Sequence, residues 1–162
     1  MLSPSPHADA VVPPALVAPI ATLAAVQQAP TPRSLLVVDD EATLRSALRR
    51  FFVRRGWRVS EAVDGEEARA MLLDGDVPGG GFDAVLSDLR MPRLSGSALH
   101  DIVMTIDPVI GARFVFSTGD SHDDEAAAFI ARTDCAVIPK PFELANLLAL
   151  VERAAVATPR TH

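Results

Sequence analysis

The sequence is poor in cysteine, in lysine and in long apolar runs. Its single cysteine, Cys135, excludes an internal disulfide framework and fits a reducing compartment. The four histidines are scattered and have no second cysteine to join them, so no zinc cluster is predicted. We expect His100 and His122 at the surface and Cys135 in a buried strand. The 15 basic and 21 acidic residues give a formal charge of −6, which disfavours broad binding of nucleic acid.

Residues 1–33 differ in composition from the rest of the chain. They contain seven of the 13 prolines, none of the nine glycines and only two charged residues. The longest apolar run without proline, residues 20–29, is half of the roughly 20 residues that a membrane helix needs. A secretory signal would carry positive charge before its apolar core, whereas Asp9 precedes this one. We therefore predict a flexible Pro/Ala-rich tether over residues 1–33, no membrane contact and a cytoplasmic location.

The remaining chain alternates between short apolar runs and amphipathic segments, within a composition of 49% apolar and 22% charged residues that is typical of globular proteins. Strands are predicted at residues 34–38, 57–63, 82–86, 113–117 and 135–138. Helices are predicted at residues 44–52, 64–73, 95–106, 122–132 and 142–155. This alternation indicates one α/β domain over residues 34–157 with a parallel sheet, followed by a frayed tail at residues 158–162.

Five polar residues follow the predicted strands directly. Because parallel strands end at one edge of a sheet, these side chains should meet there. Three carboxylates so close together would repel one another unless a cation joins them, and carboxylate oxygens with room for water suit Mg²⁺. A lysine and a threonine hydroxyl beside them could bind phosphoryl oxygens, and a carboxylate is itself a competent nucleophile. The residues are Asp39, Asp40, Asp88, Thr118 and Lys140.

Four motifs in this order resemble the receiver domain of two-component response regulators. They are Val38-Asp39-Asp40-Glu41, Leu86-Ser87-Asp88-Leu89-Arg90-Met91-Pro92, Ser117-Thr118-Gly119 and Lys140-Pro141-Phe142. The resemblance covers about residues 34–157. It implies a flavodoxin-like, doubly wound sheet of five parallel strands in the order 2-1-3-4-5, with five helices in a three-layer sandwich.

The resemblance also implies roles for individual residues. Asp88 resembles the acceptor that becomes 4-aspartylphosphate. Asp40 resembles the carboxylate that binds Mg²⁺ directly, Asp39 the one that acts largely through water, and Arg90 a residue that offers its backbone carbonyl to the metal. The donor would be a histidine kinase or a histidine phosphotransfer protein, and the chain would accept phosphate rather than act as an enzyme, with at most slow self-catalysed dephosphorylation.

Two further residues match the part of the family that senses the phosphoryl group. Thr118 resembles the switch hydroxyl and Lys140 the lysine that pairs with the phosphoryl group. The family's lysine–proline peptide is typically cis, so we expect Lys140-Pro141 to be cis.

The sequence departs from the family at the switch position, where Val137 stands in place of an aromatic residue. We therefore predict a smaller surface change on phosphorylation. A second expectation concerns Arg90 and Asp120, which flank the path of the hydrolytic water in the family and carry opposite charges here. Their pairing would obstruct that water and lengthen the life of the phosphorylated state.

Two readings stay open within the family. With about 20 residues after Lys140, we expect no DNA-binding output domain and signalling through contacts with an unknown target protein. The chain is then a stand-alone regulator or the terminal receiver of a hybrid histidine kinase. A phosphatase of the haloacid dehalogenase type is disfavoured because it needs an aspartate two positions after its nucleophile, and Glu41 follows Asp39. A receiver that never takes phosphate would lack an acid or the lysine, and none is missing.

Overall fold

The computed structural model describes residues 31–75, 78–119 and 123–156, so most of the predicted tether and the predicted tail lie outside the described residues. The chain divides into two compact units, Met1–Thr31 and Pro32–His162. The second unit contains a parallel sheet of five strands in the order β2-β1-β3-β4-β5, which confirms the predicted order. The strands are β1 (Ser34–Val38), β2 (Arg58–Ala62), β3 (Ala84–Asp88), β4 (Phe114–Thr118) and β5 (Ala136–Pro139).

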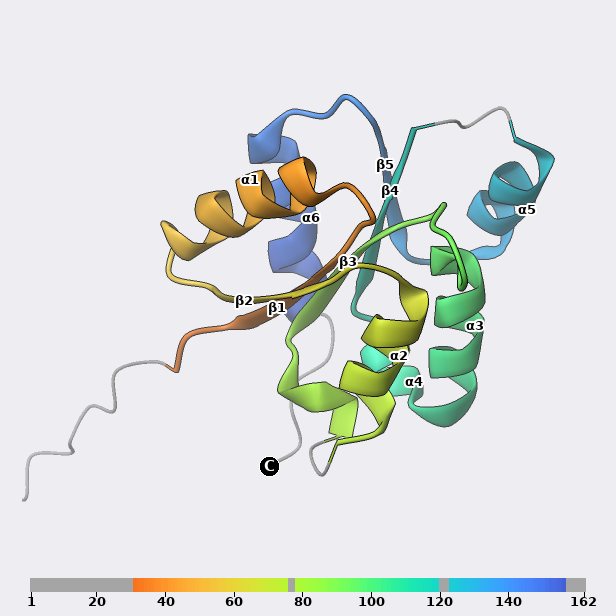
Figure 1. Ribbon diagram of the computed structural model, residues 1–162, viewed down its shortest axis with the longest axis horizontal. Coiled ribbons are helices and arrows are strands. Elements are labelled where there is room, and N and C mark those ends of the chain that lie inside the picture. The colour runs from red at the N-terminus through yellow and green to blue at the C-terminus, as the bar shows by residue number, and fades with distance from the viewer. Residues whose placement is uncertain (1–30, 76–77, 120–122, 157–162) are drawn as a thin grey trace, which may run out of the picture. The chain divides into compact units, whose positions relative to one another are not determined.

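Helices cover both faces of this sheet, as the layered fold requires. Figure 1 shows α1 (Ala42–Val53) and α6 (Leu144–Val156) on one face, and α2 (Gly65–Leu73), α3 (Gly96–Ile106) and α5 (Asp124–Arg132) on the other. Strands β1, β3 and β4 are buried along their whole length because both of their faces pack against helices. Two apolar cores result, one on each side of the sheet. Within the described ranges no helix is long and apolar enough to cross a membrane.

The described part of the chain has six α-helices rather than the predicted five. The additional one is α4 (Pro108–Gly111), and a 3-10 turn, η1 (Pro78–Gly81), precedes β3. Asp107 and Pro108 directly follow the helix predicted at residues 95–106 and so mark its end. They also begin the next one, because the Asp107 carboxylate accepts hydrogen bonds from the backbone N–H groups of Val109 (3.1 Å) and Ile110 (3.2 Å). Proline at the first position of a helix loses no hydrogen bond, because the N–H group there has no partner within the helix. The same two residues therefore end α3 and begin α4.

The junction between β3 and α3 is unusually close. The Gly96 backbone N–H donates to the carbonyl of Leu89 (3.0 Å), and the Ser95 hydroxyl caps the helix by accepting from Ala98 N–H (3.2 Å). A Cβ atom on Gly96 would lie only 2.0 Å from the Asp88 carbonyl oxygen. Glycine at this position therefore lets the start of α3 lie against the end of β3.

His100 is buried, which corrects the expectation of a surface residue. Its ring makes edge-to-face contacts with Phe114, Phe116 and Phe129, and its Nε2 atom lies 3.2 Å from the carbonyl oxygen of Gly111. The sequence suggested a polar position on α3, but that turn of the helix faces the core. Burial lowers the pKa of His100 below its ordinary value of 6.5, because the charged imidazolium loses its hydration.

The buried imidazole predicts an acid-sensitive contribution to stability. A folded-state pKa below 6.5 means that the unfolded chain takes up this proton first, so the stabilising contribution is full above pH 6.5 and is lost as the pH falls through the folded pKa. Chemical denaturation at a series of pH values should show this loss. In His100→Leu the free energy of unfolding should depend less steeply on pH over this window, because the variant lacks the imidazole that takes up the proton on unfolding. The other three histidines are the same in both proteins. An unchanged slope would contradict the assignment.

Candidate functional site

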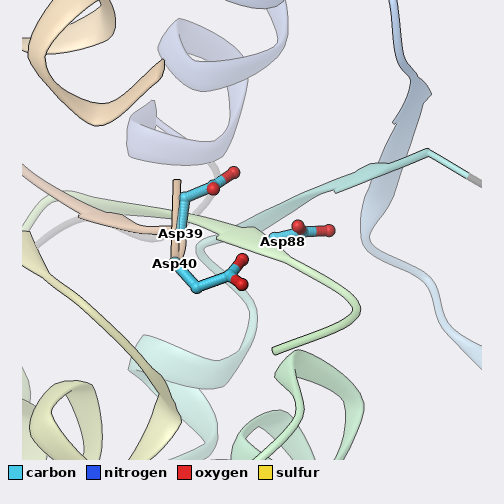
Figure 2. Close-up of side chains that lie close together, drawn as sticks. All are labelled: Asp39, Asp40 and Asp88. Carbon is cyan, nitrogen blue, oxygen red and sulfur yellow. The ribbon is translucent and has the colours of Figure 1, made fainter. Parts of the chain in front are cut away.

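Three aspartates meet at the carboxyl edge of the sheet, as the strand pattern predicts. Asp39 and Asp40 follow β1, and Asp88 is the last residue of the neighbouring strand β3. Each offers a carboxylate oxygen, and these oxygens all lie within 4.8 Å of one another. Figure 2 shows the Asp40 carboxylate on the side that faces Asp88. Asp39 and Asp88 are buried, with 2% and 8% of their surface exposed, whereas Asp40 is open to solvent.

Lys140 joins two of these acids from the end of β5. Its Nζ atom donates to Asp39 Oδ2 at 2.9 Å and to Asp88 Oδ2 at 3.1 Å. Its backbone N–H donates to the Thr118 carbonyl at 2.7 Å, which ties it to the end of β4. The Lys140-Pro141 peptide is cis, as predicted. The only lysine of the chain is thus placed against two carboxylates in the site.

The electrostatics of the site favour an additional positive charge. Burial raises the pKa of Asp88 above 3.8, and the charge of Asp39 adds to that rise, although Lys140 opposes both. Burial alone would lower the pKa of Lys140, but its hydrogen bonds to Asp39 and Asp88 and their charges outweigh it, and the pKa is raised. Three carboxylates and one ammonium leave a formal charge of −2. Asp39, Asp40 and Asp88 therefore fit a hard divalent cation that takes oxygen ligands and keeps part of its water, such as Mg²⁺.

Thr118 and Arg90 are brought near Asp88 by the neighbouring strand and by the loop after β3. In the sheet Asp88 pairs with Ser117, so Thr118, buried at the end of β4, is the next residue along the neighbouring strand. The Arg90 backbone N–H donates to Asp88 Oδ1 at 3.3 Å. A cavity of about 440 Å³ opens beside Asp40. It is lined by Asp40, Arg90, Met91, Pro92, Ser95 and Glu125.

The Arg90 side chain reaches across the site to α5. Its Nη2 atom lies 2.5 Å from Asp123 Oδ2, and Asp123 is also the N-cap of α5, accepting from Ala126 N–H at 3.1 Å. The hydrogen bond from Arg90 lowers the pKa of Asp123. Asp120, the partner expected from the sequence, lies outside the described residues. The pattern Asp123-Asp124-Glu125 marked a helix start, but nothing in it indicated that its first acid would meet Arg90.

A second ion pair that the sequence did not reveal holds the loop after β3. Asp64 is buried, caps α2 through the N–H groups of Glu66 (2.9 Å) and Glu67 (3.0 Å), and forms an ion pair with Arg93. Arg93 has a positive φ of 67°. The sequence around Asp64 indicates a helix cap, because an aspartate directly precedes a helical pattern. It does not indicate the ion pair, because Arg93 is 29 positions away along the chain.

Val137, which the resemblance places at the switch position, pairs with Phe116 in the sheet. Its half-buried side chain packs against the core on the α2, α3 and α5 side of the sheet. Ring contacts on this side come instead from Phe114, Phe116 and Phe129. These rings belong to the packed core rather than to a surface position that could rotate.

Comparisons with known proteins agree with this geometry. A family model described as the response regulator receiver domain matches residues 35–152. Response regulator MprA of Mycolicibacterium vanbaalenii is 38% identical over 121 residues, which cover 73% of this chain and 48% of MprA. Sensor kinase CckA of Brucella abortus is 33% identical over 119 residues, which cover 74% of this chain and 12% of CckA. The chain thus spans about half of one relative and about an eighth of the other.

Solved structures show the same fold. The structure of a response regulator receiver domain protein from Clostridium thermocellum superposes with a TM-score of 0.67 at 23% identity, covering 77% of this chain and 95% of that one. At 23% identity this similarity supports the fold alone. Membership of the family rests on the family model and on the more similar sequences. With the family model covering most of the folded unit and the acids and lysine at its carboxyl edge, the chain belongs to the response regulator receiver domain family.

Proposed function

We propose that this chain is a phosphoacceptor of a two-component phosphorelay, in which Asp88 takes a phosphoryl group from a phosphohistidine. The observation that carries the proposal is the pair of contacts from Lys140 Nζ to Asp39 and Asp88, beside the open carboxylate of Asp40. A partly buried nucleophile, a point charge and oxygen ligands for a cation are what phosphoryl transfer needs. The sensor kinase among the relatives supports a histidine kinase as the kind of donor.

In this proposal each residue has a distinct task. An Asp88 carboxylate oxygen attacks phosphorus, and the leaving imidazole nitrogen of the donor keeps the electron pair of the broken N–P bond. Asp39 and Asp40 would hold Mg²⁺ together with Asp88 and the Arg90 carbonyl, and the bound cation supplies neutralisation of the phosphoryl oxygens. Lys140 is close enough to Asp88 to follow the new phosphoryl group, and the Thr118 hydroxyl is the neighbouring donor.

The test is to incubate the protein with acetyl phosphate, with Mg²⁺ or with EDTA, and to map the product by mass spectrometry. We expect one phosphoryl group, on Asp88, formed only when Mg²⁺ is present. A modification elsewhere, or none with any donor, would contradict the proposal. Turnover of a small phosphomonoester would instead favour the phosphatase alternative, because a receiver accepts one phosphoryl group and stalls.

The proposal leaves the hybrid-kinase reading open. The match to a short stretch of sensor kinase CckA fits a receiver derived from a larger kinase, and the match to MprA fits a response regulator. Reconstitution with an isolated histidine phosphotransfer protein and with a histidine kinase would identify the kind of donor.

The contact between Arg90 and Asp123 predicts a long-lived phosphorylated state. The pair connects the loop after β3 to the start of α5, and we infer that it narrows the approach of water to Asp88. Arg90→Ala should shorten the half-life of the aspartyl phosphate several-fold while leaving its formation in place. The half-life is measured by following the phosphorylated protein after the donor is removed. The same change at a distant arginine, Arg69→Ala, should have no effect, and an unchanged half-life in Arg90→Ala would refute the idea.

The valine at position 137 predicts only a small structural change at β5 on phosphorylation. Because valine has no ring to rotate, beryllofluoride with Mg²⁺ should shift backbone amide signals strongly around Asp88 and Thr118 and only weakly around Val137. Nuclear magnetic resonance spectra with and without beryllofluoride provide the comparison. Large shifts centred on Val137 would show that this face switches without an aromatic residue.

A further inference from the structure

Four exposed arginines gather where α1 ends and β2 begins. We call Arg50, Arg54, Arg55 and Arg58 the arginine surface. Residues 42–60 contain six arginines and no acidic residue, which gives this stretch a formal charge of +6. The whole chain has a formal charge of −6, so everything outside the stretch sums to −12. A strongly positive surface therefore stands on an otherwise acidic protein.

In the part of the chain that the structure describes, two of the six arginines form ion pairs, and both share a single carboxylate. Arg45 and Arg49 each lie 3.6 Å from a carboxylate oxygen of Glu61 on β2. The four residues of the arginine surface form no ion pair with any carboxylate in residues 31–75, 78–119 and 123–156. Like charges crowded together raise the energy of the folded state, so an arrangement that leaves them unpaired calls for an external anion.

Aromatic rings beneath the arginines fix some of their guanidinium groups. The Arg55 guanidinium carbon lies 3.6 Å from the centre of the Phe51 ring, and its Nη1 donates to the Phe51 carbonyl at 3.2 Å. Arg33 directly precedes β1, and its carbonyl accepts a hydrogen bond from the Arg58 backbone N–H at 2.8 Å. Its guanidinium carbon lies 5.7 Å from the centre of the Trp57 ring. A guanidinium that is already oriented loses less conformational entropy when it binds a carboxylate.

Helix electrostatics explains only part of this arrangement. A cation in the last turn of a helix is favoured by the helix dipole, which accounts for Arg50. It does not account for Arg58, which begins β2. Nor does the surface belong to the phosphoacceptor site. Strand β2 starts at the amino edge of the parallel sheet, whereas the three aspartates lie at the carboxyl ends of β1 and β3.

We propose that the arginine surface docks an acidic segment of a partner protein. Guanidinium forks bind carboxylates in pairs of hydrogen bonds, which a short glutamate- or aspartate-rich segment would supply. A short segment can contact the four arginines alone, which lie close together along the chain. A long nucleic acid or a flat anionic membrane would face that negative charge as well, so an acidic protein segment is the occupant that the charge distribution favours.

The test measures binding of a dye-labelled peptide in which glutamate alternates with serine, by fluorescence anisotropy at several salt concentrations. The wild-type protein should bind it, should ignore the same peptide with glutamine in place of glutamate, and should lose affinity as salt rises. Replacing Arg50, Arg54 and Arg58 together by glutamine should weaken binding at least about tenfold, since three charge pairs are lost. Lysine at the same positions should restore part of this affinity but not all of it.

The matched control removes the same number of charges elsewhere, by changing Arg69, Arg132 and Arg153 to glutamine. This control should bind the glutamate peptide like the wild type. Melting temperatures of both triple variants should show that each protein folds. No binding by the wild type, or an equal loss in the control, would overturn the proposal. Tighter binding to a single-stranded oligonucleotide or to phosphatidylserine vesicles would overturn the assigned partner. Phosphorylation of Asp88 should be unchanged in both variants, so this test stands apart from that of the phosphoacceptor site.

Discussion

Asp88→Asn should abolish phosphorylation by acetyl phosphate, with a loss of at least about a hundredfold in the rate of product formation. An amide oxygen is a poor nucleophile, and the substitution removes the attacking group while leaving the shape of the side chain almost unchanged. The Lys140 contact to Asp39 remains in the variant, so the rest of the site should stay in place. Phosphoprotein is quantified by mass spectrometry after timed exposure to donor and Mg²⁺.

The same substitution should also stabilise the protein at neutral pH. Burial and the charge of Asp39 raise the folded-state pKa of Asp88, so its contribution to stability is full below pH 3.8 and is lost as the pH rises through the folded pKa. Asparagine carries no charge to desolvate. The free energy of unfolding of the variant should therefore increase relative to that of the wild type as the pH rises through the folded-state pKa of Asp88. Equilibrium denaturation at acidic and neutral pH measures the difference.

Asp74→Asn is the matched control for both measurements. Asp74 is exposed at the end of α2, away from the carboxyl edge of the sheet, and its carboxylate lies 3.9 Å from the nearest guanidinium nitrogen of Arg69. This variant should accept phosphate at the wild-type rate and show no comparable gain in stability. Equal phosphorylation of Asp88→Asn and Asp74→Asn would remove Asp88 from its proposed role.

Gly96→Ala should destabilise the fold by about 3 kcal/mol. The added methyl group would lie 2.0 Å from the Asp88 carbonyl oxygen and 2.9 Å from Ser87 Oγ, and a backbone atom of a buried strand cannot move away as a flexible side chain can. Either the start of α3 must withdraw or β3 must shift, and each change disturbs the end of the strand that carries Asp88. The midpoint of urea denaturation should fall accordingly, and phosphorylation should slow.

Gly75→Ala provides the comparison at a glycine without neighbours. A Cβ atom there meets nothing within 4 Å, so the stability should change by less than about 1 kcal/mol. If the two alanine variants unfold at the same urea concentration, the close approach between α3 and β3 has no energetic consequence.

The sequence predicts most of this fold because its signals are local and mutually consistent. Leu35, Val37 and Val38 belong to a short apolar run that ends at two acids, and β1 is found at the predicted residues 34–38. The other boundaries shift by at most two residues, as at β5, predicted over residues 135–138 and found at Ala136–Pro139. The meeting of Asp39, Asp40, Asp88 and Lys140 follows from the rule that parallel strands end at one edge.

What the sequence did not predict depends on contacts between distant residues. The partners of Arg90 and Arg93 are set by how two loops approach α5 and α2, and neither approach leaves a local pattern. His100 looked like a surface residue because histidine is polar, but its ring is enclosed by three phenylalanines from β4 and α5. Helix α4 was missed because a proline after an aspartate marks both the end of one helix and the beginning of the next.

Lys140 has a consequence for any chemistry directed at amines. It is the only lysine among 162 residues, so apart from the α-amino group an acylating reagent or a lysine acetyltransferase has a single target on this protein. Acetylation there would take the ammonium from Asp39 and Asp88 in one event and leave two neighbouring buried carboxylates without it. Labelling, crosslinking or immobilising the protein through lysine would therefore act on the proposed phosphoacceptor site. A cysteine-directed reagent would instead meet Cys135, which precedes the opposite end of β5.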